Sequence, residues 1–389
     1  MFALSIIPLI LKLSVTCKSL SQVWFADDAS GAGSLQGLRQ WWDALSTLGL
    51  SFGYYPKPSK TCLVIHPQNE EAAKVVFGEA GITITTEGQP HLGSALGSVS
   101  FKEEYVKHKV DEWRVEVEKL AEMAGSQPQA AYAAFVHGTR NKWNYVCRTV
   151  SNCSHLLQPV EDAIQQKLIP AITGRPPCSR DERTLLALPA RLGGLGLADP
   201  TSIAIHEYDA SREIIASMVQ SIINQETTFS QDPTAANPSI IDIKRRKKEQ
   251  QESEFARIYD ARDSSRRLLD CACEPGASTW LSALPVEEHG FCLSKSSFRD
   301  ALSLWFGWQL PDLSSKCACG KSFSVDHAMM YHKGGLPTLR HNEVCDLTAA
   351  LLAETCTGVS VEPPLQALDD EEFNSTQAIE MTRRDLTSK

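Results

Sequence analysis

The stretch VWFADDA at Val23–Ala29 determines the expected fold of the N-terminal part, because two adjacent aspartates follow an apolar run. Small residues come next, so the pattern predicts a strand, a tight turn that carries Asp27 and Asp28, and a second strand. Neighbouring carboxylates repel each other, and a divalent cation removes this repulsion. Mg²⁺ binds a few carboxylate oxygens together with substrate phosphates, and paired ions drive nucleotidyl transfer. A solvated pair of aspartates in a hairpin turn is the alternative.

The segments that follow this turn continue the alternation of helices and short strands. Ser34 is a predicted N-cap, and apolar residues at helical spacing predict a helix over residues 34–50. The sequence GLSFGYYPKPSKT at Gly49–Thr61 then leads into an apolar strand, Cys62–Ile65. A second short strand-turn unit is predicted at His91–Ser98. These elements predict an α+β region in which an antiparallel sheet packs on helices.

With these motifs in this order, the chain resembles a reverse transcriptase of the non-LTR retrotransposon kind. Phe25–Asp28 matches the catalytic FADD/YADD box of that family. Gly53–Thr61 is similar to the family's next motif, and His91–Gly97 is similar to its primer-grip hairpin. The resemblance implies RNA-directed DNA polymerase activity by two-metal nucleotidyl transfer, with an RNA template and a DNA primer or target as partners.

The resemblance also implies roles for single residues. Asp27 and Asp28 are expected to be catalytic ligands of Mg²⁺. Lys60 is expected to be catalytic as the motif lysine, in the role of a proton donor to the leaving pyrophosphate. His91 and Gly93 are expected to contact nucleic acid.

The segment Met1–Leu13 is strongly apolar, and a buried helix within residues 1–18 is the favoured interpretation. No basic residue precedes Lys12, so a targeting segment is the weaker alternative, and polar residues interrupt the run before the roughly 18 apolar residues of a membrane span. In the family, an additional catalytic aspartate lies on an upstream strand, and no acidic residue of this sequence matches it. The chain is therefore expected to be the C-terminal part of a polymerase, inactive alone.

Composition favours an intracellular protein, nuclear or cytoplasmic and not secreted, without a membrane partner. The chain has twelve cysteines and no signal-peptide pattern, which favours free thiols and a metal site over a disulfide framework. A secreted, disulfide-bonded protein is a weak alternative. The net charge of −9 argues against a uniformly basic surface, so local basic patches would have to contact phosphates.

The region after the primer-grip motif is predicted to be helical. The apolar stripe of its first long helix consists of Val106, Val110, Trp113, Val117 and Leu120. Further helices are expected over 128–150 and 154–172, with breaks at Pro170 and Gly174. The glycine-rich segment Leu188–Leu197 lacks the pattern of a phosphate-binding loop and predicts a structural turn.

Residues 226–242 are polar and contain prolines, which predicts a linker or exposed loop. Five basic residues follow, Lys244, Arg245, Arg246, Lys247 and Lys248. They are expected to open a charged helix that runs from Gln250 to Leu269. This basic run predicts nucleic-acid binding or a nuclear localisation signal, and a solvated helix face is the alternative.

A second chemical signal lies near the C-terminus. Cys317, Cys319 and His327 are candidate ligands of Zn²⁺, because thiolates and imidazoles at short spacing bind this ion tetrahedrally. The resemblance implies a CCHC zinc knuckle whose fourth position falls on Tyr331, and tyrosine is a poor zinc ligand. The adjacent His332 is the candidate replacement. A degenerate site with reduced thiols is the alternative.

Four parts are therefore expected along the chain, in the α+β class. They are a partial reverse transcriptase palm (1–100), a helical thumb or connection (101–225), a linker and helical region (226–310), and a zinc-knuckle region with the beginning of an endonuclease-like region (311–389). A helix opening at Leu339 and running through Leu352 marks this last beginning by resemblance. The alternative function is a noncatalytic nucleic-acid-binding remnant that uses the zinc knuckle and the basic helix.

Overall fold

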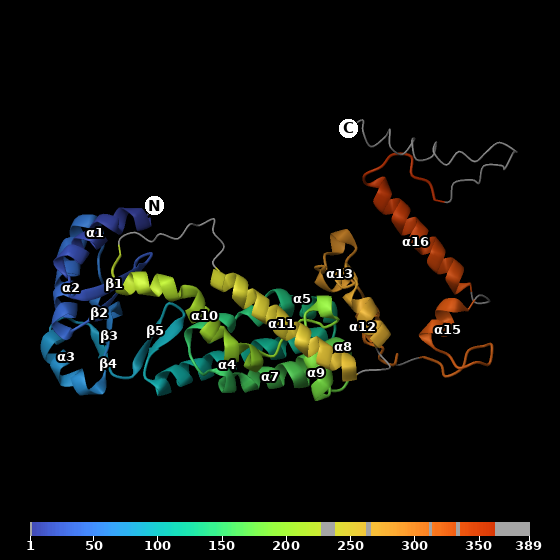
Figure 1. Cartoon of the computed structure of the whole chain (residues 1–389), viewed down its shortest axis with the longest axis horizontal. Helices are drawn as coiled ribbons and strands as arrows, with labels where there is room; N and C mark the ends of the chain where they lie inside the picture. The colour runs from blue at the N-terminus through green and yellow to red at the C-terminus, as the bar shows by residue number, and fades with distance from the viewer. Residues whose placement is uncertain (1, 227–237, 262–265, 311–312, 332–334, 362–389) are drawn as a thin grey trace. The chain divides into compact units, whose positions relative to one another are not determined.

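The structure is a computed structural model of the whole chain. The residues that it describes are 2–226, 238–261, 266–310, 313–331 and 335–361. The chain divides into two compact units, Met1–Trp308 and Gln309–Lys389 (Figure 1). The described residues are mostly helical, with short strands confined almost entirely to the first 97 residues, which agrees with the predicted α+β class.

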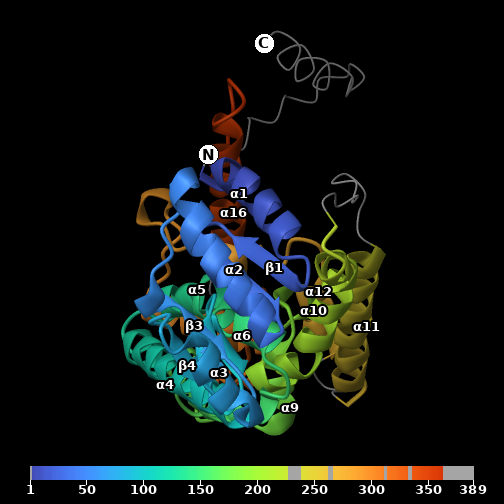
Figure 2. The same ribbon diagram turned by 90° about the vertical axis from the view of Figure 1, so that its left-hand side faces the viewer.

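The predicted hairpin of Asp27 and Asp28 packs on two helices. The elements that build it are α1 (Phe2–Thr16), β1 (Leu20–Phe25), β2 (Asp28–Gly33) and α2 (Leu35–Leu48). Figures 1 and 2 both show α1 and α2 beside β1. Leu13 of α1, Leu20 of β1 and Trp41 of α2 belong to one buried apolar cluster. Ser34 caps α2 as predicted, because its side chain accepts the Gly37 N–H.

The described strands form three separate two-stranded sheets. The remaining strands are β3 (Cys62–Val64), β4 (Thr83–Thr85), β5 (Gly88–His91) and β6 (Ser94–Gly97). β1 with β2 and β5 with β6 are antiparallel hairpins, whereas β3 and β4 pair in parallel. The antiparallel pairing predicted for the Asp27–Asp28 hairpin is therefore confirmed, whereas the parallel pair of β3 and β4 was not predicted. The chain between β3 and β4 forms α3 (Glu70–Phe77), and a helical crossover returns the second strand in the same direction.

The helical part of the first unit begins with α4 (Val99–Ala124), which buries four of the five predicted stripe residues and packs Leu120 against the same core. The shorter helices around this core are α5 (Pro128–His137), α6 (Asn144–Thr149), α7 (Gln158–Ala163), α8 (Ile169–Thr173), α9 (Arg180–Ala187), α12 (Arg266–Cys273), α13 (Thr279–Ser282) and α14 (Lys295–Phe306). Phe135 and Trp143 are among its fully buried side chains. In Figure 1 the labelled helices α5, α8 and α9 of this core lie away from the blue helices α1 and α2.

Two details of the predicted helices differ from the structure. The expected helix over 128–150 is interrupted, because α5 ends at His137 and a 3₁₀ turn precedes α6. Pro170 does not break the helix: it is the second residue of α8, which continues directly from the π-helical segment Ile164–Leu168. The Ile169 N–H bonds to the Ile164 carbonyl in the π-helical pattern, so the helix runs on across the proline, which lacks an N–H. Gly174 ends α8 as expected, with a left-handed φ of 73°.

The basic run lies inside a helix and not at its beginning. α10 (Pro200–Ile223) is followed by α11 (Pro238–Ala261), so the linker prediction was wrong for residues 238–242 and the predicted start at the basic run was also wrong. A proline at the first helical position favours this earlier start. Asp242 also pairs with Arg245 and Arg246 one turn later, which favours the helix. Residues 227–237 of the predicted linker lie outside the described residues.

The second unit contains α15 (Val325–Met330) and α16 (Leu336–Ala353), so the helix expected from Leu339 begins three residues earlier. The two helices contact each other. Among the helices in the described part of the chain, none has both the length and the apolar character needed to cross a bilayer.

Candidate functional site

The two aspartates lie at an exposed turn between β1 and β2. Phe25 pairs with Asp28, so Ala26 and Asp27 are the two turn residues. Ala26 has a left-handed φ of 53°, at a position where a type II′ turn favours glycine. A non-glycine residue keeps such a conformation only where its surroundings hold it. Asp27 and Asp28 are both exposed, so their carboxylates are accessible to a ligand.

Tyr54 supplies part of that support. Its hydroxyl donates a hydrogen bond of 3.0 Å to the backbone carbonyl of Asp27. Its ring meets the ring of Trp24 edge to face, with centroids 5.3 Å apart. Burial, with the negative charges of Asp27 and Asp28, raises the pKa of Tyr54, so the hydroxyl stays protonated as a donor at neutral pH.

A buried glutamine fixes the base of the hairpin. Gln22 donates through Nε2 to the Ile10 carbonyl at 3.2 Å and to the Ser14 hydroxyl at 2.6 Å. Its Oε1 accepts the indole N–H groups of Trp24 and Trp41, both at 3.1 Å. The amide side chain thus makes four hydrogen bonds, which is its full capacity.

Gln225, just beyond α10, binds the outer edge of β1. Its Oε1 accepts the Gln22 backbone N–H at 3.2 Å, and its Nε2 donates to the Gln22 carbonyl at 3.3 Å. The amide side chain therefore replaces a neighbouring strand at this position. Gln225 has a left-handed φ of 51°, a second non-glycine outlier in contact with the hairpin.

An open cavity of about 980 Å³ lies beside the turn. Its wall includes Asp27, Asp28, Lys60 and His91, four residues that the sequence predicted to be functional. Lys60 ends the 3₁₀ turn Pro58–Lys60 and is exposed. Among the described residues of this wall, Asp27 and Asp28 are the only carboxylates. The pair fits one divalent ion whose remaining ligands are water or phosphate oxygens, whereas a second ion needs a further carboxylate.

The β5–β6 hairpin connects this cavity to the helical part of the unit. The Ser30 hydroxyl lies 3.4 Å from Nε2 of His91, which joins β2 to β5. At the hairpin tip, Tyr145 donates to the Leu92 carbonyl at 2.7 Å and Tyr105 donates to the Gly93 carbonyl at 2.9 Å. These bonds fix the predicted primer-grip residues against α4 and α6. Contact of His91 and Gly93 with nucleic acid stays a prediction.

Most of the positive charge on the basic run is paired with carboxylates. The pairs are Arg245 with Asp242 and Glu249, Arg246 with Glu213 and Asp242, Lys247 with Glu207, and Lys248 with Glu252. In the described part of the chain, Lys244 makes no ion pair. Glu207 and Glu213 belong to α10, so Lys247 and Arg246 connect α11 to α10. The positive potential that the basic run can present to phosphates is therefore weaker than the sequence suggested.

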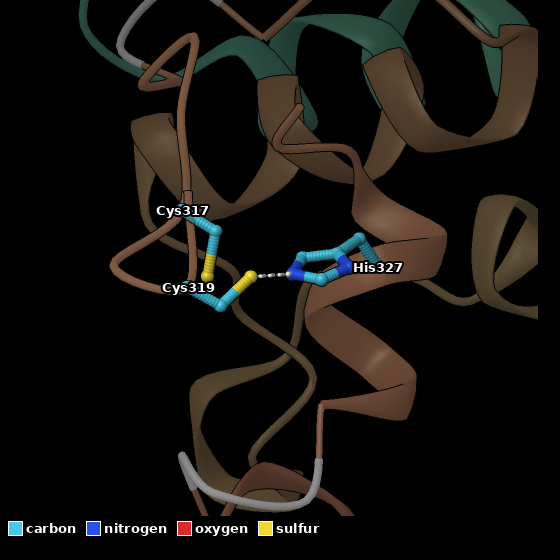
Figure 3. Close-up of side chains that lie close together, drawn as sticks. All are labelled: Cys317, Cys319 and His327. Atoms are coloured by element: carbon cyan, nitrogen blue, oxygen red, sulfur yellow. Dashed lines mark hydrogen bonds between the residues drawn. The ribbon is translucent and has the colours of Figure 1, made fainter. Parts of the chain in front are cut away.

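Three of the predicted zinc ligands converge in the second unit. The ligand atoms of Cys317, Cys319 and His327 all lie within 4.8 Å of one another, and Cys319 Sγ is 3.3 Å from Nε2 of His327 (Figure 3). Figure 3 shows both cysteines on one loop, facing the imidazole on α15. This spacing and donor set fit Zn²⁺. The fourth candidate, His332, lies outside the described residues.

Backbone hydrogen bonds build this cluster locally. The Cys317 N–H donates to the Lys321 carbonyl at 2.9 Å, and Gly320 turns the loop with a left-handed φ of 82°. A hydrogen bond from the Lys321 backbone, with a further one from Cys317, lowers the pKa of the Cys319 thiol. The Tyr331 ring stacks on His327, with centroids 5.3 Å apart. Tyr331 therefore lies beside the cluster.

Sequence reasoning missed Tyr54, Gln22 and Gln225. Tyr54 lies inside the motif-like stretch Gly49–Thr61, and that placement was the available signal for it. Gln225 has no sequence signal, because its contacts with the Gln22 backbone join residues 203 positions apart. The partners of the Gln22 side chain are nearer in sequence, but only the packing of α1 and α2 on β1 brings them around it.

Comparison with protein-family models found no match for this chain, and neither did comparison with curated proteins or with solved structures.

Proposed function

We propose that the N-terminal part of this chain is a portion of the palm of a metal-dependent nucleotidyltransferase, of the reverse transcriptase type found in non-LTR retrotransposons. The supporting observation is that three segments far apart in sequence meet at one cavity. These are the Asp27–Asp28 turn, the 3₁₀ turn that ends at Lys60, and the β5–β6 hairpin that carries His91. The proposed substrates are a nucleoside triphosphate and an RNA-templated DNA primer.

Each residue has a role in this proposal that its chemistry allows. Asp27 and Asp28 hold Mg²⁺, which when bound neutralises phosphate charge. Lys60 is the cation that donates a proton to the leaving pyrophosphate. His91 and the hairpin tip orient the primer end at the cavity rim. Because the described wall offers one carboxylate pair, the isolated chain is expected to bind a metal–nucleotide complex without extending a primer.

Calorimetric titration of the full chain with a deoxynucleoside triphosphate and Mn²⁺ tests this proposal. Asp27→Asn and Lys60→Ala should each weaken binding, since they remove a metal ligand and a phosphate-facing cation. Asp43→Asn is the matched control, because Asp43 is an exposed carboxylate on α2 that pairs with Arg39. Absence of triphosphate binding by the wild type, or equal losses in all three variants, would contradict the proposal.

Primer extension gives a second test. The chain alone should show no extension with Mg²⁺ or Mn²⁺, and joining it to an upstream palm segment that carries a further catalytic carboxylate should produce activity that Asp27→Asn abolishes. Robust extension by the isolated chain would show that one carboxylate pair suffices.

The second candidate is a noncatalytic nucleic-acid-binding protein that uses the cysteine–histidine cluster of the second unit and the basic helix α11 of the first. The convergence of Cys317, Cys319 and His327 favours it. Here Zn²⁺ would stabilise the loop, and Lys244 on α11 would supply a phosphate contact. Binding of single-stranded RNA that depends on Zn²⁺ and is unaffected by Asp27→Asn would favour this candidate over the first.

A further inference from the structure

The turn that carries the two aspartates needs an external restraint. Ala26 adopts a left-handed φ of 53°, which costs free energy for any residue other than glycine. Only two residues form the turn, and both carboxylates are exposed, so side-chain packing of the aspartates does not hold it. The restraint therefore has to come from another segment and to act on the backbone of the turn.

Tyr54 contacts that backbone directly. Its hydroxyl bonds the carbonyl of Asp27, the residue next to the strained alanine, and leaves the carboxylate free. This bond connects the C-terminal residue of the turn to the loop that carries Tyr54. The donor is thus placed where it restrains the peptide unit between Asp27 and Asp28.

Tyr54 is itself held by neighbouring elements. Its N–H donates to the Gly49 carbonyl at 2.9 Å, and a side chain at Gly49 would approach the Tyr54 carbonyl to 2.7 Å. Its ring lies against Trp24, whose indole N–H is bound by the buried Gln22. The phenol therefore reaches the turn from a fixed position, connected to the core of the hairpin.

We infer that Tyr54 is a positioning residue whose hydroxyl holds the Ala26–Asp27 turn so that the carboxylates of Asp27 and Asp28 face one divalent cation together. This inference rests on the proposed function of the cavity. Tyr54 acts through the Asp27 backbone and does not ligate the ion. Without the hydroxyl, the turn relaxes and the two carboxylates separate, so that the affinity for the cation falls.

Tyr54→Phe in the full chain isolates this contribution, because it keeps the ring on Trp24 and removes only the donor. Tyr55→Phe is the matched control, since Tyr55 is the next residue, is exposed, and makes no hydrogen bond through its hydroxyl to a described residue. Mn²⁺ alone is the probe, with free ion measured by electron paramagnetic resonance. Hydrogen–deuterium exchange of the peptide 23–29 reports the turn, and thermal unfolding verifies that each variant is folded.

The expected result is faster exchange at the turn and about 10-fold weaker Mn²⁺ binding in Tyr54→Phe, with wild-type values in Tyr55→Phe. Unchanged exchange in Tyr54→Phe, or faster exchange with unchanged affinity, would overturn the positioning role. If Asp27→Asn loses Mn²⁺ binding in the same experiment, the proposed metal site is supported whatever the result for Tyr54→Phe. If the wild type binds no Mn²⁺, the proposed metal site is wrong and the positioning role is wrong with it.

Discussion

The two candidate metal sites are built over very different distances along the chain. The Asp27–Asp28 turn depends on Gln22, whose backbone is bound by a residue 203 positions away, and it borders a cavity whose wall comes from several elements. The Cys317–Cys319–His327 cluster is made by one loop and one short helix, and its Cys319–His327 contact joins residues 8 positions apart. The first site therefore requires a folded first unit, whereas the second requires only local turns and a metal ion.

The largest expected effect comes from breaking the ion pair in the core of the first unit. Arg183 and Glu161 are both buried and make two charge-assisted hydrogen bonds of 2.6 and 2.7 Å. Glu161→Ala leaves the guanidinium buried without its partner, which should lower the free energy of unfolding by about 3–5 kcal/mol. Chemical denaturation measures this loss.

Glu116→Ala is the control for that change, since Glu116 pairs with Lys142 at the surface and should cost less than about 1 kcal/mol. Mn²⁺ binding at the turn should be lost at lower denaturant in Glu161→Ala, while Co²⁺ binding at the cysteine cluster keeps its wild-type midpoint. If Mn²⁺ and Co²⁺ binding are both lost at lower denaturant in Glu161→Ala, both sites depend on the folded first unit and the contrast between them is wrong.

Removing a thiolate gives the next effect in size. Cys319→Ser should weaken Co²⁺ binding more than about 100-fold, because one of the converging ligands is lost. The visible absorption of thiolate-bound Co²⁺ measures this. Cys271→Ser, which removes an exposed cysteine on α12, should change nothing.

The same cluster allows a gain of affinity. Tyr331→Cys should tighten Co²⁺ binding, because Tyr331 stacks on His327 beside the other ligands and a thiolate there completes a tetrahedral set. If neither wild type nor Tyr331→Cys binds metal, Cys317, Cys319 and His327 are packing residues only.

Gln22→Leu should have an intermediate effect on stability, about 2 kcal/mol. It removes the acceptor of two indole N–H groups, and Trp41 is buried. Exchange at the turn should rise together with the loss of stability, as measured by denaturation and by hydrogen–deuterium exchange. Gln36→Leu is the control on exposed α2 surface, and an equal loss there would show that the amide network does not matter.

The smallest expected effect is a pH dependence in the first unit. Burial alone would raise the pKa of Asp199, but hydrogen bonds from Thr201 and Ser202 outweigh it and hold the pKa below the usual value. The stabilisation is therefore present above about pH 4, the value for an unfolded aspartate, and is lost as pH falls through the lower folded pKa. Asp199→Asn keeps the cap of α10 and should flatten the fall of the free energy of unfolding below about pH 4. An unchanged profile would assign the acid sensitivity to other groups.

Much of the local structure was predictable from the residues. The turn signal at Asp27–Asp28, the serine cap at Ser34 and the apolar stripe of α4 are each confirmed, because turn chemistry, capping and periodicity act over a few residues. The parallel pairing of β3 with β4 was not predicted, since strand direction depends on the path of the connecting chain. The pairing of the basic run with α10 was also missed, because Glu207 and Glu213 approach from another helix.

By itself, the sequence determined the two sets of chemical groups: adjacent carboxylates on a hairpin turn, and two thiolates with an imidazole at short spacing. Tertiary structure alone decided which residues share a cavity with the carboxylates and which side chain restrains their turn. The physical reason is distance along the chain. Short-range preferences of the backbone place groups that are close in sequence, whereas Lys60, His91, Tyr54 and Gln225 reach the hairpin only when burial of apolar surface brings their elements together.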